Sequence, residues 1–321
     1  MQRVGLKAGA FIALLAFSWA APITGAALSS ATRKPASKVS PNSNQRTTVE
    51  VPGPVRIRDV RGRGLLVSVW LNHQGPFTFA VDTGAGVTLV GADVARRAGL
   101  AGKSGRRVSI GGLSNAIATS GEETTLDDVA LGVPNNLTRS GQRAFIVTTL
   151  PRGLDGILDP TETFAPLGYV IDIAGGALVA LDSTTRLRPG NEPEGGTVVR
   201  WIREGGDKRP FVRLGDSRLA LIDTGSGFGL GVTGTVVGSG AANHRKNDSV
   251  RDLNGGAVEA RRVEPTTVSI GSLVLRNVPT EVLIGAHDEA PVILGRGALY
   301  PFRITFDPVS RLIEIAPSRE R

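Results

Sequence analysis

The sequence predicts an all-β fold of two homologous β-barrel lobes, with a functional cleft between the lobes. The chain is rich in turn-forming residues, with 42 glycines and 19 prolines among 321 residues, and it has few stretches with a helical pattern. From Val51 onward, short apolar runs are separated by Gly, Pro and Asn, which is typical of strands joined by turns. Two similar blocks, residues 79–86 and 220–227, each run from an apolar strand into Asp-Thr-Gly.

Residues 1–27 have the composition of a secretory signal peptide. Arg3 and Lys7 provide a basic start, residues 8–21 are mostly apolar, and residues 24–26 are small enough for cleavage. A retained membrane anchor is the alternative, but the apolar stretch is shorter than the roughly 20 residues that span a bilayer. Residues 28–50 are rich in Ser, Thr, Pro, Lys and Asn, which predicts a disordered linker. We expect an exported protein, periplasmic or secreted, with no stable membrane insertion after signal cleavage.

The rest of the chain divides into two halves that repeat four landmarks in the same order. These are Asp82, Gly111–Gly112, Ile157–Leu158 and Asp172 in the first half, and Asp223, Gly255–Gly256, Ile293–Leu294 and Asp307 in the second. Counted from Asp82, the first Gly, the Leu and the last Asp of these landmarks lie 29, 76 and 90 residues away, and counted from Asp223 they lie 32, 71 and 84 residues away. We predict an N-terminal lobe over 51–188 and a C-terminal lobe over 195–318, joined near 185–196.

Composition argues against several classes of function. The chain has no cysteine, which excludes disulfides, thiol catalysis and cysteine metal sites. Its three histidines are far apart, so we expect no metal site. The net charge of +8 is scattered along the chain and aromatic residues make up only 5%, so we expect no nucleic-acid partner. The missing cysteines and the short signal suggest a bacterial envelope or secreted setting.

The two Asp-Thr-Gly blocks contain the residue types that can hold two carboxyl groups face to face. An Asp at the end of a buried strand is held rigidly, the Thr can hydrogen-bond to backbone of the other half, and the Gly leaves room for close approach. Two carboxyl groups about 3 Å apart cannot both ionise easily, so one pKa rises and the other falls. One carboxylate can then take a proton from water while the other acid protonates a peptide carbonyl oxygen.

With these motifs, residues 55–317 resemble the aspartic proteases of the pepsin and retropepsin type, in a single-chain form with two lobes. The resemblance implies an aspartic endopeptidase with aspartic-protease-like β-barrel lobes, a polypeptide substrate and no cofactor, and we expect a monomer. It implies that Asp82 and Asp223 are the catalytic pair. Within the same blocks it implies bracing and spacing roles for Thr83, Gly84, Thr224 and Gly225.

Each half also has a Gly-Gly pair at the position of the flap. Gly111–Gly112 and Gly255–Gly256 are therefore flap candidates, and two equivalent flaps fit retropepsin better than pepsin. The flap Tyr of pepsin is missing, because the only tyrosines are Tyr169 and Tyr300. Asp159 follows Ile157–Leu158 where the family has Gly, which predicts a distorted loop or a third carboxyl group nearby. These departures leave one alternative function, a catalytically inactive peptide-binding protein on the same fold.

The two blocks differ at the residue after Asp-Thr-Gly, which is Ala85 in the first and Ser226 in the second. A hydroxyl group at this position can donate a hydrogen bond to its own carboxylate, which favours the charged form, whereas an alanine cannot. We therefore expect Asp223 to carry more of the negative charge and Asp82 to hold more of the shared proton.

Overall fold

The computed structural model describes residues 51–100, 107–114, 119–203, 208–234, 248–251, 257–287 and 290–318, and the backbone of 11–12 and 17–18. Strands predominate among these residues, so the all-β prediction is confirmed. The helices in the described part are short, namely α1 (Ala92–Arg97), α2 (Pro160–Phe164) and α3 (Arg296–Leu299). No described helix has the length and apolar content to cross a membrane. The predicted linker at 28–50 and most of the predicted signal peptide lie outside the described residues.

The first sheet has ten strands and comes mainly from the first half of the chain. Along it lie β10 (Val129–Leu131), β5 (Gly64–Leu71), β6 (Gln74–Val81), β12 (Gly156–Leu158), β7 (Thr88–Gly91), β11 (Gln142–Val147), β9 (Thr119–Leu126), β8 (Arg107–Gly111) and β2 (Phe17–Ser18), while β4 (Arg58–Val60) pairs with β5.

The second sheet has eight strands and comes mainly from the second half. Along it lie β16 (Phe211–Arg213), β17 (Leu219–Asp223), β22 (Val292–Gly295), β18 (Leu230–Thr233), β21 (Leu273–Ile284), β20 (Ala257–Ile270), β19 (Asp248–Arg251) and β1 (Phe11–Ile12).

The two sheets share one strand pattern. The order β5-β6-β12-β7-β11-β9-β8 in the first sheet corresponds to β16-β17-β22-β18-β21-β20-β19 in the second. The strand directions also agree: β6 and β12 are parallel, as are β17 and β22, while β12 and β7 are antiparallel, as are β22 and β18. The repeat that the sequence shows in four landmarks is therefore a repeat of the whole sheet topology.

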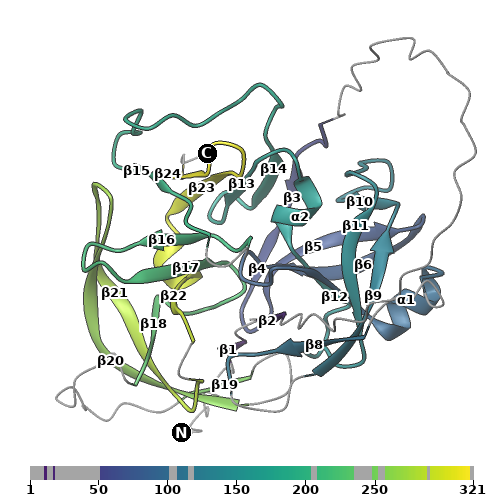
Figure 1. Cartoon of the computed structure of the whole chain (residues 1–321), viewed down its shortest axis with the longest axis horizontal. Helices are drawn as coiled ribbons and strands as arrows, with labels where there is room; N and C mark the ends of the chain where they lie inside the picture. The colour runs from purple at the N-terminus through teal and green to yellow at the C-terminus, as the bar shows by residue number, and fades with distance from the viewer. Residues whose placement is uncertain are drawn as a thin grey trace, which may run out of the picture.

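A third sheet of six strands joins the halves (Figure 1). Its order is β15 (Thr197–Arg200), β24 (Leu312–Pro317), β23 (Phe302–Asp307), β13 (Tyr169–Asp172), β14 (Ala177–Ala180) and β3 (Val55–Arg56). The middle pair, β13 and β23, is antiparallel and brings one strand from each half together. On one side of this contact the sheet consists of three strands of the second half, and on the other side of three strands of the first half. The predicted linker at 185–196 lies between β14 and β15, where most residues are exposed.

The strands that lead to the site are buried on both faces. At the end of β6, Phe79 and Val81 point into the largest hydrophobic cluster, whereas Ala80 between them belongs to a second cluster on the opposite face. This explains the apolar run directly before Asp82, because a strand segment covered on both sides has no polar face. The largest cluster also contains Ile222 and Leu294 of the second half, so the two halves share a core.

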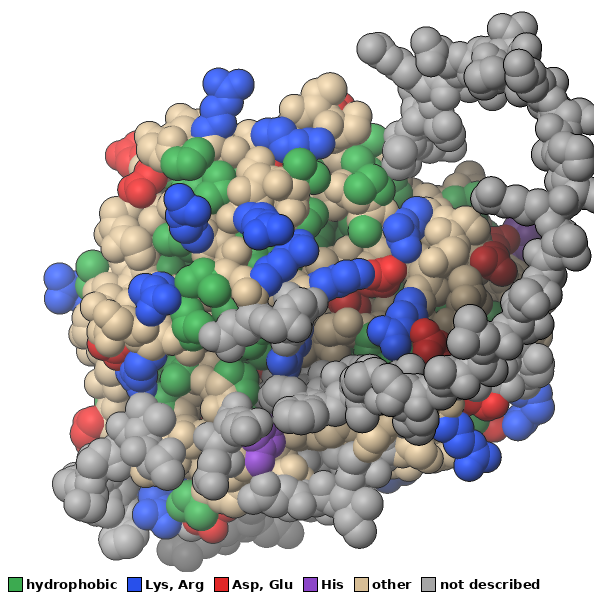
Figure 2. Space-filling model, viewed as in Figure 1, with side chains coloured by type: hydrophobic (Ala, Val, Ile, Leu, Met, Phe, Trp, Pro, Cys, Tyr) green, Lys and Arg blue, Asp and Glu red, His purple; other side chains and the backbone are tan. Residues whose placement is uncertain are grey.

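The basic side chains form no single patch on the face seen in Figure 2, where Lys and Arg are spread among polar and apolar groups. This distribution agrees with the scattered positions of these residues in the sequence.

Candidate active site

The two Asp-Thr-Gly loops begin at equivalent strand ends. Asp82 directly follows β6, and its N–H donates to the carbonyl oxygen of Leu158 in the parallel strand β12 at 3.0 Å. Asp223 is the last residue of β17 and is paired with Gly295 at the end of the parallel strand β22. Both Asp side chains are completely buried. The apolar strands therefore hold each carboxyl group at a fixed position in the protein interior.

The Thr residues of the two loops bind each other's half of the molecule. The Thr83 hydroxyl donates to Ile222 O at 2.7 Å, and the Thr224 hydroxyl donates to Val81 O at 3.1 Å. Each hydroxyl also accepts the backbone N–H of the other threonine, at 3.1 Å for Thr83 N and 3.0 Å for Thr224 N. The four reciprocal hydrogen bonds hold the loops together across 141 residues of sequence.

The glycines allow each loop to lie against the carboxyl group of the other. A Cβ atom on Gly84 would lie 2.8 Å from Cγ of Asp223, and one on Gly225 would lie 2.4 Å from Cγ of Asp82. Real Cβ atoms essentially never come this close to another heavy atom. Any side chain at either position would push a carboxyl group away, so the site requires glycine for space.

One oxygen of each carboxyl group is held by its own loop. Oδ1 of Asp82 accepts the N–H of Gly84 at 2.8 Å, and Oδ1 of Asp223 accepts those of Gly225 at 2.8 Å and Ser226 at 3.1 Å. The Oδ2 atoms of both residues are buried and receive no N–H or hydroxyl hydrogen bond from the described residues. The two carboxyl groups therefore have their free oxygens available for a shared proton and for a reacting group.

The two carboxyl groups differ in acidity. Burial raises the pKa of Asp82 well above its ordinary value, and the neighbouring Asp223 raises it further. Burial also raises the pKa of Asp223, but the hydrogen bond with Asp82, the N–H groups of Ser226 and Gly225, and the charge of Arg296 oppose that rise. The shared proton therefore favours Asp82, and the negative charge favours Asp223.

Arg296 is a buried cation beside the two Asp residues, and no motif of the sequence predicts its role. It is the first residue of α3, and its Nη1 donates to the carbonyl oxygen of Thr224 at 2.5 Å. Its Nε lies 3.4 Å from Oδ1 of Asp59 in β4 of the first half. The sequence shows a charged residue directly after Ile293-Leu294-Gly295. It does not show that this residue contacts Thr224 and Asp59, which lie 72 and 237 residues away in the chain.

Asp159 provides a third buried carboxyl group near Asp82. Its backbone adopts φ −81° and ψ 107° as the residue that caps α2, so the loop is a regular helix start. Of the two outcomes that the sequence predicted, a distorted loop or a nearby carboxyl group, the structure has the second. The Asp159 charge acts on Asp82 and raises its pKa. Among the described residues, no three His, Asp or Glu side chains form a group that could hold a metal ion.

The Ser226 side chain is placed differently from the prediction. Its hydroxyl oxygen accepts the N–H of Phe228 at 3.2 Å, whereas the bond to Asp223 comes from the Ser226 backbone N–H. The predicted hydroxyl donation to Asp223 is therefore corrected to a backbone donation. Ala85 has no corresponding bond to Asp82, because only Gly84 N donates to that carboxylate among the described residues. The two loops therefore differ in the number of backbone N–H groups that bind the carboxylate, two for Asp223 and one for Asp82.

The first Gly-Gly pair lies where the hairpin β8–β9 turns. Gly111 ends β8, and Gly112 follows it before β9 begins at Thr119. The next residue, Leu113, was not identified from the sequence: its side chain is completely buried in a hydrophobic cluster of the second half, and its carbonyl oxygen accepts His287 N at 3.2 Å. The hairpin thus reaches across to the other half. Gly255 and Gly256 lie outside the described residues, between β19 and β20.

The fold and this geometry define a class of site: two buried carboxyl groups, held face to face by paired Asp-Thr-Gly loops at the interface of two similar halves. Residues 67–158 match a family described as Aspartyl protease. The match contains Asp82, and it supports an aspartyl protease family and hence polypeptide substrates. A search of curated proteins finds no match to the chain.

Proposed function

We propose that the protein is an aspartic endopeptidase that hydrolyses peptide bonds with a water molecule activated by Asp82 and Asp223. The observation that carries this proposal is the reciprocal contact of the two loops, in which Gly84 lies against the Asp223 carboxyl group and Gly225 against that of Asp82. The family match over residues 67–158 supports the same activity. The equal strand order of the two large sheets supports a bilobed, single-chain form of the pepsin and retropepsin type.

In this mechanism the acidity of each group assigns its role. Asp223, the more charged partner, takes a proton from water while the water oxygen bonds to the peptide carbonyl carbon. Asp82 gives its proton to the carbonyl oxygen, which produces a tetrahedral diol. When the C–N bond breaks, Asp223 gives its proton to the amine nitrogen and Asp82 regains one from a diol hydroxyl. The products are a carboxylic acid and an amine, and the dyad of Asp82 and Asp223 returns to its starting state.

The activity is tested with an unfolded protein as substrate over about pH 3 to about pH 8, with and without pepstatin, an inhibitor of aspartic proteases. We expect cleavage that pepstatin blocks. Asp82→Asn and Asp223→Asn should each abolish it with the fold retained, whereas Asp216→Asn, at an exposed turn, should not. Near-normal turnover in either dyad variant would overturn the proposal. Peptide binding without cleavage by the unmodified chain would favour the inactive peptide-binding alternative.

We also propose that the protein is exported to a periplasmic or extracellular location, as supported by the basic and apolar composition of residues 1–27. Fractionation of cells that express the full chain, with N-terminal sequencing of the product, tests this. Mature protein that begins near residue 28 outside the cytoplasm is expected, and uncleaved protein in the cytoplasm would contradict it.

A further inference from the structure

The two halves differ at the strand position that lies next to each catalytic candidate. In the second half, Asp223 is paired with Gly295 at the end of the parallel strands β17 and β22. In the first half, Val81 is paired with Leu158 in the equivalent strands, so that Asp159 follows beside Asp82. Neighbouring strands lie about 4.8 Å apart. A carboxyl-bearing residue therefore lies beside Asp82, and its counterpart beside Asp223 is a glycine.

Only the first half has space for a side chain at this position. A Cβ atom on Gly295 would lie 2.6 Å from Phe228 O and 3.0 Å from Ser226 O, which excludes a carboxyl group there. Asp159 instead is built into the first half: its N–H donates to the Thr88 hydroxyl at 3.1 Å, and its Oδ1 accepts Thr161 N at 2.9 Å. Its Oδ2 is buried and has no hydrogen-bond partner among the described residues.

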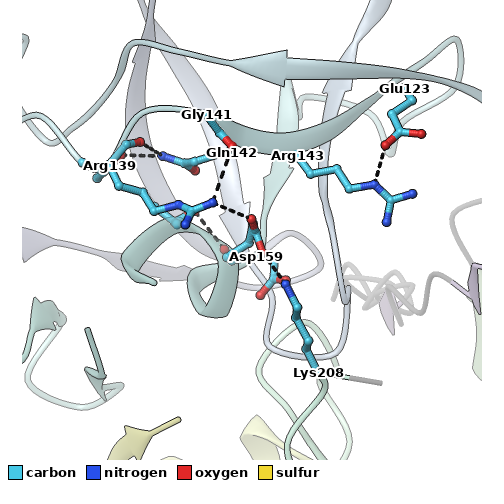
Figure 3. A network of polar contacts seen from close by, with 10 residues as sticks. Glu123, Arg139, Gly141, Gln142, Arg143, Asp159 and Lys208 are labelled. Carbon is cyan, nitrogen blue, oxygen red and sulfur yellow. Dashed lines mark hydrogen bonds and ion pairs between the residues drawn. The ribbon is translucent and has the colours of Figure 1, made fainter. Parts of the chain in front are cut away.

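The charged neighbours of Asp159 are engaged with each other. Glu162 of α2 binds Arg139 at 3.0 Å and Lys208, from the second half, at 2.9 Å. Figure 3 shows Arg139 and Lys208 extending toward the region of Asp159 from opposite sides. Tyr169 of β13 shares a hydrogen bond with the Thr161 hydroxyl at 2.9 Å, and burial raises its pKa well above its ordinary value, so it stays neutral. Among the described residues, no ion pair joins Arg139 or Lys208 to Asp159. Burial raises the pKa of Asp159, the charge of Glu162 raises it further, and the charge of Lys208 opposes the rise. Asp159 in turn acts on the carboxyl group of Asp82.

We propose that Asp159 is a positioning residue of the dyad, whose carboxyl group keeps the shared proton on Asp82 and thereby fixes Asp82 as the acid and Asp223 as the base. Arg296 completes the arrangement, because this cation follows Gly295 in the second half and favours the charged form of Asp223. An acidic residue, Asp159, thus follows the strand beside Asp82, whereas a basic residue, Arg296, follows the strand beside Asp223. This inference rests on the proposed peptidase function, and its test includes a measurement that does not.

The charge of Asp159 should change the basic limb of the pH–rate profile. Burial raises the pKa of Asp159 to about 7, so its carboxyl group becomes charged near neutral pH. The charged form raises the pKa of Asp82, which lets Asp82 keep its proton to higher pH. Without this charge, Asp82 would lose the proton at lower pH, and activity would fall earlier as the pH rises. The acidic side reports protonation of Asp223 and should change little.

Asp159→Asn is the decisive variant, because Asn removes the charge and still caps a helix well. In this variant, we expect the basic limb of the kcat/KM profile to move to lower pH, because a charge that raises the pKa of Asp82 is gone. Asp159→Gly, which copies Gly295, should move it equally although it removes the cap. Glu162→Gln, which alters a neighbouring carboxyl group bound to two cations, serves as the control and should move it much less.

Carboxyl ¹³C NMR of the same proteins follows the titration of Asp82 without any substrate. We expect Asp82 to lose its proton at lower pH in Asp159→Asn than in the unmodified chain. Unchanged Asp82 titration and an unchanged basic limb in Asp159→Asn would overturn the inference and leave the peptidase function standing. A limb that moves only in Asp159→Gly would also overturn it, since the cap would then be the cause. If no protein cleaves substrate, the peptidase function fails and the NMR shift alone decides the inference.

Discussion

Asp82 and Asp223 end similar apolar strands, yet their neighbours give them different properties. Asp82 has one loop N–H donor and the carboxyl group of Asp159 nearby. Asp223 has two loop N–H donors and the Arg296 guanidinium nearby. Each of these differences favours the proton on Asp82. The sequence predicts the same direction from the Ser226 hydroxyl, but the donor at that residue is its backbone N–H. The sequence could not distinguish the two donors, because the contact depends on the geometry of the turn.

The role of Arg296 leads to a prediction at the residue scale. Arg296→Gln removes a positive charge that lowers the pKa of Asp223, so that pKa should rise and the acid limb of the kcat/KM profile should move to higher pH. The variant should also be destabilised by about 2–4 kcal/mol, because a buried donor to Thr224 O and a partner of Asp59 are lost. A pH–rate profile and urea unfolding measure the two effects.

Asp59→Asn is the matched control for this variant. It weakens the ion pair but leaves the guanidinium beside Asp223, so it should reduce stability without moving the acid limb upward. An acid limb that stays in place in Arg296→Gln, or moves up equally in Asp59→Asn, would show that Arg296 acts through structure alone.

At the scale of elements, the two loops form one unit because their threonines satisfy each other's backbone. Thr224→Val removes a hydroxyl that donates to Val81 O and accepts Thr83 N, so two buried backbone groups lose their partner. We expect a loss of about 2–4 kcal/mol in the free energy of unfolding, together with a fall in kcat. Urea denaturation and steady-state kinetics provide the measurements.

Thr224→Ser keeps the hydroxyl group and loses only a methyl group, so it should cost less than about 1.5 kcal/mol. The reciprocal variant Thr83→Val should behave like Thr224→Val, because its hydroxyl makes the equivalent bonds to Ile222 O and Thr224 N. Equal stability of the Val and Ser variants would contradict a role for the hydroxyl bonds.

The sequence could predict elements whose pattern is local. The apolar runs before Asp82 and Asp223 form strands as expected. The repeated pairs Ile157–Leu158 and Ile293–Leu294 also lie in strands. The contacts of Leu113 and Arg296 could not be predicted, because each depends on a strand or loop far away in the chain that only sheet pairing brings close. Asp159 could be recognised as unusual, but its position beside Asp82 follows from the parallel register of β6 and β12.

At the scale of the whole molecule, the repeat in sequence predicted two similar halves, and the two large sheets have the same strand order. The four repeated sequence landmarks could not predict how much the two halves contact each other. The third sheet has its central contact between β13 and β23, where Tyr169 stacks on Phe306 with ring centroids 4.7 Å apart. The largest hydrophobic cluster draws residues from both halves. Each half therefore completes its core with the other.

This association predicts how a cut chain behaves. A protease site inserted after Gly190, within the exposed stretch 188–192, should be cleaved readily in the folded protein. The two fragments should then remain together in size-exclusion chromatography without denaturant and should retain hydrolytic activity, because the β13–β23 contact and the threonine bonds do not need the connection. Urea unfolding of the cut protein should show one transition, at a midpoint that depends on protein concentration, whereas the uncut insertion variant should show none of that dependence. Fragments that separate on the column, or two transitions that assign one stability to each half, would mean that the lobes are independent domains and that the shared cluster adds little to the fold.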